Sequence, residues 1–197
     1  MLETFIPRIR GILTRPADTF REAKDDPRND VFATLAILFE FSALMGLLLI
    51  LAGLAPGVDT GTIGLISILG VLVLTPVFGI VSVILVSVWV HCCAWLAGAR
   101  QPSGRTLTAL AYSTVPALLF GWIPVIDPVF MLWGLVLLVP GLRECQELTT
   151  QRALLAVFIA VLPLIILLAL TILMPERFSL LPNPSLSSGV VLVRPWW

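Results

Sequence analysis

The longest apolar block of the chain sets the strongest limit on what it can fold into. Residues 63–97 contain no charged side chain at all. A helix over this block is roughly 50 Å long, whereas the hydrocarbon core of a bilayer is roughly 30 Å thick. The interior of a small soluble protein cannot surround such a helix, so we expect the block to lie in a membrane.

The composition of the chain leads to the same class of protein. Of its 197 residues, 58% are apolar and 12% are charged, whereas soluble domains have about 45–50% and about 25%. These values exclude a soluble enzyme, a secreted disulfide scaffold and a nucleic-acid binder. The 12 basic and 12 acidic residues give no net charge that attracts nucleic acid. The fold class we predict is an all-α integral membrane bundle.

Apolar segments separated by short polar turns predict five membrane-spanning helices. The third is marginal because it contains Ser and Thr and carries Pro116. The polar regions outside the spans are an N-terminal segment over 1–30 and a Pro/Ser-rich tail over 175–197, so the transmembrane domain covers 31–174. The five predicted spans are 31–54, 63–97, 106–122, 128–142 and 153–174.

The distribution of basic residues favours five spans over six. If 63–97 crosses once and the N-terminus is cytoplasmic, ten of the 12 basic residues lie inside. If the block instead splits into two spans, only eight do. Cytoplasmic loops carry the excess of Lys and Arg, so we expect a cytoplasmic N-terminus and a C-terminus outside.

The N-terminal segment predicts two short helices at the membrane surface. An apolar stripe with spacings of three and four runs from Leu2 to Leu13, with Arg8 and Arg10 off that stripe. A second helix is expected to begin at Pro16, with Phe20 and Ala23 on one side. The alternative is a solvated segment next to the membrane.

Glu40 and His91 are the two side chains inside predicted spans that carry chemistry. Glu40 is near the middle of its span, where a charge costs roughly 2.5–3.5 kcal/mol, so it should face the interior, be protonated or be paired. His91, the only histidine, is six residues before the end of the second span, which makes an intramembrane polar pair possible. Such a pair is either a proton or ion site or a packing contact, and we favour the packing contact.

Signatures of enzymes and metal sites are weak throughout the sequence. Three successive residues, His91, Cys92 and Cys93, point about 100° apart on a helix and do not close on one metal ion. No HExxH, GxSxG or P-loop motif occurs. We therefore expect no catalytic residue, no metal site and no cofactor, and we expect the protein not to be an enzyme.

One set of residues runs from the N-terminal segment to the fourth span: Pro16, Phe20, Gly98, Gly104, Thr106, Tyr112, Ser113, Pro116, Trp133 and Gly141. This set resembles the YIP family (Ypt/Rab-interacting-protein, Yip-one domain), in its bacterial and archaeal branch. The resemblance covers roughly residues 14–174. It implies five spans and a cytoplasmic N-terminus. The eukaryotic members bind small GTPases, but their D-L-Y-G-P element has no counterpart here, so GTPase binding is not expected.

The sequence therefore predicts a non-enzymatic scaffold or adaptor in a prokaryotic cytoplasmic membrane. Its expected partners are membrane lipid and other membrane proteins or further copies of itself, and not nucleic acid. The alternative is a small-solute or ion permease that uses Glu40 and His91. The residues expected to form the interaction surface of the scaffold are Arg8, Arg10, Phe20, Gly98, Gly104, Arg105, Tyr112 and Pro116.

Overall fold

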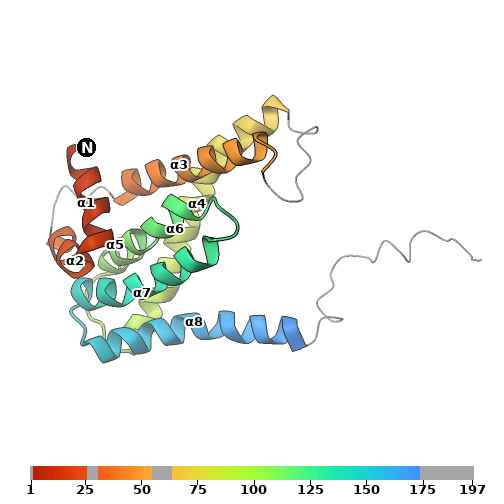
Figure 1. Ribbon diagram of the computed structural model, residues 1–197. Coiled ribbons are helices and arrows are strands. Elements are labelled where there is room, and N and C mark those ends of the chain that lie inside the picture. Colours follow the sequence, from red (N-terminus) through yellow and green to blue (C-terminus); the bar gives the residue numbers. More distant parts are fainter. Residues whose placement is uncertain (1, 26–30, 55–63, 174–197) are drawn as a thin grey trace, which may run out of the picture. The chain divides into compact units, whose positions relative to one another are not determined.

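The described part of the chain folds into helices alone. The computed structural model describes residues 2–25, 31–54 and 64–173, and no strand occurs among them (Figure 1). The predicted turn at 55–62 and the predicted tail at 175–197 lie outside the described residues. The helices are α1 (Leu2–Thr14), α2 (Pro16–Asp25), α3 (Val31–Leu51), α4 (Leu65–Leu96), α5 (Ser103–Ser113), α6 (Val115–Phe120), α7 (Asp127–Cys145) and α8 (Thr150–Leu173).

Four of the described helices are long and apolar enough to cross a membrane: α3, α4, α7 and α8. Helix α4 continues for 32 residues with Pro76 inside it, so the longest apolar block is one helix and not two spans. The second N-terminal helix begins at Pro16 as predicted.

The third predicted span is two helices instead of one. Helix α5 ends at Ser113, α6 begins at Val115, and neither reaches the length of a span. Proline has no backbone N–H, so Pro116 cannot bond the carbonyl of Tyr112, and this helical hydrogen bond is missing where α5 ends and α6 begins.

The chain divides into two compact units, residues 1–160 and 161–197. In the first unit α5 contacts α1, α2, α4 and α7, while α3 contacts α4 and α6. Seven of the 11 residues of α5 are buried, so α5 supplies much of the core. In the second unit, the described residues belong to the last part of α8, and their apolar side chains are largely exposed.

Helices α3 and α4 approach closely at a glycine. A Cβ atom on Gly79 would lie 2.6 Å from the ring of Phe39, so the α3–α4 contact requires a residue without a side chain at this position. The contact lies eight residues from the start of α3 and 17 residues from the end of α4. The end of α4 therefore extends beyond the start of α3.

Candidate functional site

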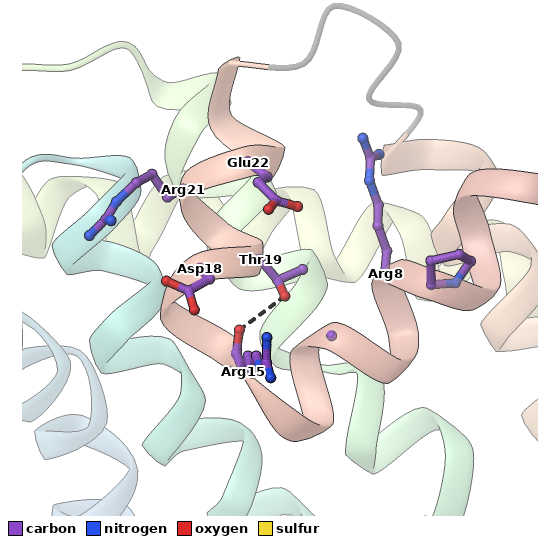
Figure 2. Close-up of a pocket in the computed structure, with 8 residues that line it drawn as sticks. Arg8, Arg15, Asp18, Thr19, Arg21 and Glu22 are labelled. Atoms are coloured by element: carbon purple, nitrogen blue, oxygen red, sulfur yellow. Dashed lines mark hydrogen bonds between the residues drawn. The ribbon is translucent and has the colours of Figure 1, made fainter.

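Helices α1 and α2 form a helical hairpin, called the hairpin below, that packs onto the rest of the first unit. The two helices meet where Gly11 contacts the side chain of Thr19. The hydroxyl of Thr19 donates to the carbonyl of Arg15 at 3.0 Å, which closes the turn between the helices (Figure 2). The hairpin is thus a folded element with a core contact of its own.

The hairpin is anchored by Phe20. Its side chain is fully buried, and a Cβ atom on Gly141 of α7 would lie 3.1 Å from its ring. The thiol of Cys145 lies 4.0 Å from the Phe20 carbonyl oxygen. Because a larger residue at 141 would displace the ring, the pairing of Phe20 with Gly141 positions the hairpin on α7.

Glu147 joins three chain segments at the end of α7, and we call Lys24, Gln101, Arg105 and Glu147 the polar junction. Its carboxylate accepts from Lys24 Nζ at 3.2 Å, from Gln101 Nε2 at 3.0 Å and from Arg105 Nη1 at 3.2 Å. The donors belong to α2, to the α4–α5 loop and to α5. One acidic side chain therefore connects the hairpin to residues 98–105, which form the α4–α5 loop and the start of α5 and are called the Gly98–Arg105 loop below.

The backbone of Glu147 adopts a conformation that favours glycine. Its φ is 55°, in the left-handed region, and the N–H of Leu148 bonds the carbonyl of Arg143 at 3.1 Å, which closes the end of α7. A residue with a side chain is conformationally unfavourable at such a position. Hydrogen bonding from Lys24, followed by the charges of Lys24 and Arg105, holds the pKa of the Glu147 carboxyl below its ordinary value.

Two further contacts join the hairpin to the bundle. Glu144 is nearly buried and pairs with Arg21 of α2 at 3.2 Å and with Arg143 at 2.9 Å. Arg8 Nη1 donates to the hydroxyl of the buried Tyr112 at 3.2 Å. Together with Phe20 and the polar junction, these contacts join α1 and α2 to α5 and α7.

A cleft of about 440 Å³ lies between the two helices of the hairpin, and its lining includes charged side chains of both signs. Figure 2 shows Arg21 extending away from the cleft, which agrees with its ion pair to Glu144 on α7. Asp18 and Glu22 share the cleft with Arg8 and Arg15, so it has no strong field of one sign.

His91, Thr106 and Gln146 form a second polar group, which we call the inner cluster. Two of its members, Thr106 and Gln146, are chain neighbours of junction residues. Gln146 Nε2 donates to Thr106 Oγ1 at 2.7 Å and to the carbonyl of Pro102 at 3.3 Å. A carbonyl only accepts, so Pro102 determines which end of the Gln146 amide faces it. His91 Nδ1 lies 2.9 Å from Thr106 Oγ1, and Gln146 Oε1 has no partner among the described residues.

The residues predicted to form an interaction surface divide into two groups in the structure. Phe20, Tyr112 and Pro116 are fully buried and belong to the core. The other five are exposed or half-buried: Arg8, Arg10, Gly98, Gly104 and Arg105. The apolar and aromatic character of Phe20, Tyr112 and Pro116 suits packing as well as binding, and the sequence motif alone did not distinguish the two.

The structure does not bring Glu40 and His91 together. Glu40 lies in a groove beside Pro76, and His91 is 15 residues further along α4, about 22 Å by helical rise. The predicted pair assumed that α3 begins where α4 ends. Because α4 extends past the start of α3, His91 reaches α5 and contacts Thr106 instead.

Sequence reasoning missed the acceptors that organise this region. The segment that ends α7 carries Glu144, Gln146 and Glu147, while the α4–α5 loop and the hairpin carry cations. The available signal was the presence of two acidic residues in a polar loop between uncharged spans. Which cation each carboxylate meets depends on tertiary packing.

The four apolar helices, together with a hairpin docked on α5 and α7, define a multi-pass helical membrane protein. A family model described as the Yip1 domain matches residues 10–173, well over half of the chain. The chain belongs to this family. No curated protein and no solved structure matches it.

Proposed function

We propose that the protein is a non-enzymatic membrane scaffold that binds other membrane proteins through the face formed by the hairpin and the Gly98–Arg105 loop. The observation that carries the proposal is the polar junction. Glu147 joins α2, the α4–α5 loop and α5, although its backbone conformation disfavours a side chain there. This arrangement presents several chain segments as one surface, as an adaptor requires.

The exposed cations of this face suit it to acidic partners. Arg10 and Arg15 are exposed, and no hydrogen bond or ion pair of either side chain is found within the described residues. An unpaired guanidinium is well suited to bidentate recognition of a carboxylate or phosphate. Acidic segments of membrane proteins and anionic lipid headgroups are therefore the ligands expected for this face.

The proposed topology has five crossings, with α5 and α6 together forming the third. The N-terminus is then cytoplasmic, the C-terminus is outside, and the host membrane is a prokaryotic cytoplasmic membrane. The distribution of basic residues supports this arrangement. Cysteine labelling from each side of the membrane tests it at Gln101 and Val125, which flank α5 and α6.

In that experiment the three native cysteines are first replaced by alanine. Five crossings place Gln101→Cys inside and Val125→Cys outside, so an impermeant maleimide added outside labels only the second variant. Labelling of both variants from one side would mean that α5 and α6 do not cross together. The scaffold proposal would then survive with four crossings.

The scaffold function is tested by photo-crosslinking in cells from position 10, on the hairpin, and from position 104, at the start of α5. Both sites should capture the same membrane protein, and Phe20→Ala should reduce capture at position 10 because it removes the hairpin anchor. A photo-crosslinker at the exposed Leu167 of α8 is the matched control. Capture of no partner at either site, with proton or ion flux in liposomes, would support the permease instead.

A further inference from the structure

Glu40 has the most unusual environment of any charged side chain in the described spans. It lies in the middle of α3, which is otherwise uncharged, and it is exposed. No described residue forms a hydrogen bond or ion pair with its carboxyl group. Ionisable residues inside membranes almost always face the bundle interior or a water-filled cavity, and Glu40 faces neither.

The surroundings of Glu40 form an open groove of about 520 Å³. Its walls are apolar and come from α3 and from Pro76 of α4. Pro76 lies inside α4 and has no N–H to give to the carbonyl of Leu72. Among the residues that line the groove, Glu40 carries the charged group, so its carboxylate is the acceptor that an occupant can meet there.

The exposed side of α3 has the spacing of a helix-packing seam. From Ile37 onward, apolar residues recur at alternating spacings of four and three residues, the repeat that packs one helix against another. Glu40 lies beside this seam, at the position where heptad helices carry the charges that pair with a neighbour. The residues of the seam are Ile37, Phe41, Leu44, Leu48 and Leu51, and all except the half-buried Ile37 are exposed.

We infer that this seam binds a transmembrane helix of another membrane protein, and that this helix brings a lysine or arginine to Glu40. A cation complements the carboxylate of Glu40. The seam extends from Ile37 to Leu51, and such a length fits a partner helix better than a small amine. The inference rests on the proposed scaffold function and names one class of partner for it.

A second copy of the chain does not meet this requirement. Helices α3 and α4 contain no basic residue, and the basic residues of α7 and α8 lie near the helix ends, at Arg143 and Arg152. Two copies packed seam to seam about a two-fold axis at Glu40 would bring Glu40 against Glu40, which requires a proton and not a cation.

Photo-crosslinking from Leu48 tests the inference in the intact protein in its own membrane. A second photo-crosslinking site at Leu85 of α4, which is also exposed, is the control. The wild-type groove should capture a membrane protein whose crosslinked span contains a lysine or arginine. Glu40→Gln should reduce this product at least about tenfold, because it removes one member of a desolvated charge pair.

Three controls separate binding from folding. Glu22→Gln removes an exposed carboxylate of the hairpin and should leave the product unchanged. Phe41→Ala should weaken the product without changing any charge. Because the Glu40 carboxyl bonds no described residue, Glu40→Gln should leave thermal unfolding in detergent unchanged.

A charge exchange makes the decisive comparison. Glu40→Lys, combined with a glutamate in place of the partner's basic residue, should restore the product that either change alone removes. The inference is overturned if the captured peptide belongs to this chain, lacks a basic residue or forms equally with Glu40→Gln. It is also overturned if Leu48 captures nothing while position 10 captures a partner, in which case the scaffold function stands. If neither site captures a partner, both proposals fail.

Discussion

Two regions of the first unit are built on different principles. One is the polar end, where the hairpin, the α4–α5 loop and the end of α7 meet, and the other is the outer pair, helices α3 and α4. At the polar end, residues as different as Phe20, Thr106 and Tyr112 are buried and each meets a particular neighbour. In the outer pair, only 6% of the most apolar window of α4 is buried, compared with 33% of that of α7. Most of α4 therefore faces the surroundings of the protein.

This difference indicates at which positions the identity of the side chain matters most. A helix that faces lipid needs only to be apolar, because many side chains satisfy that condition equally. A helix that packs on protein needs a particular size or hydrogen-bonding group at each contact, because its interior is close-packed. Substitutions should therefore have large effects at the polar end and small effects along the exposed part of α4, away from its contacts with α3 and α5.

The largest expected effect is that of Phe20→Ala. Removing a fully buried aromatic side chain costs about 3–5 kcal/mol, and the loss should fall on the docking of the hairpin. Limited proteolysis of the purified protein should then cleave α1 and α2 while the spans remain intact. Ile6→Ala, at a position that is 66% exposed on α1, is the control. Equal protection of both variants would contradict the anchoring role of Phe20.

Two glycines of α4 compare a position in the α3–α4 contact with a position outside it. Gly79→Ala should destabilise the protein by about 1–3 kcal/mol, because the new Cβ would lie 2.6 Å from the Phe39 ring. Gly70→Ala meets nothing within 4 Å and should stabilise the helix by up to about 1 kcal/mol. Thermal unfolding in one detergent measures both, and shifts of the same sign would contradict the close approach of α3 and α4.

Thr106→Val tests the inner cluster without changing the shape of the side chain. It removes the acceptor of Gln146 Nε2 and the contact with His91, and it should cost about 1–2 kcal/mol. Thr108→Val is the matched control, since the Thr108 hydroxyl bonds only the nearby Gly104 carbonyl at 3.1 Å. Chemical denaturation compares the two variants, and an equal loss would show that the inner cluster contributes nothing specific.

The smallest expected effect is the pH dependence of the polar junction. The pKa of Glu147 is lowered in the folded protein, first by its hydrogen bond from Lys24. A carboxyl with a lowered folded pKa stabilises the fold above its ordinary pKa, and this contribution is lost as the pH falls through the folded value. Docking of the hairpin should therefore weaken on acidification.

Proteolysis of α2 at a series of pH values measures this effect. Glu147→Gln should lack the part of the acid sensitivity that belongs to this carboxyl, whereas Glu22→Gln, on the exposed side of the hairpin, should retain it. An unchanged pH profile for Glu147→Gln would mean that the junction does not hold the hairpin.

Prediction from sequence succeeded where one segment supplies the whole signal. The unbroken apolar block predicted that α4 is one helix, and Pro16 predicted where α2 begins. It did not succeed at Pro116, where one proline divides a predicted span into α5 and α6. The Glu40–His91 pair depended on how far α4 extends past α3, which no local pattern contains.

The sequence by itself determined the class of protein, the positions of the four apolar helices and the family resemblance, because hydrophobicity and helix signals act over neighbouring residues. Only the tertiary structure decided that Phe20 and Tyr112 are core residues, that Glu147 joins three segments, and that Glu40 faces outward. These outcomes depend on contacts between residues far apart in the chain. The same side chain can anchor a core or meet a partner, and its neighbours in space determine which it does.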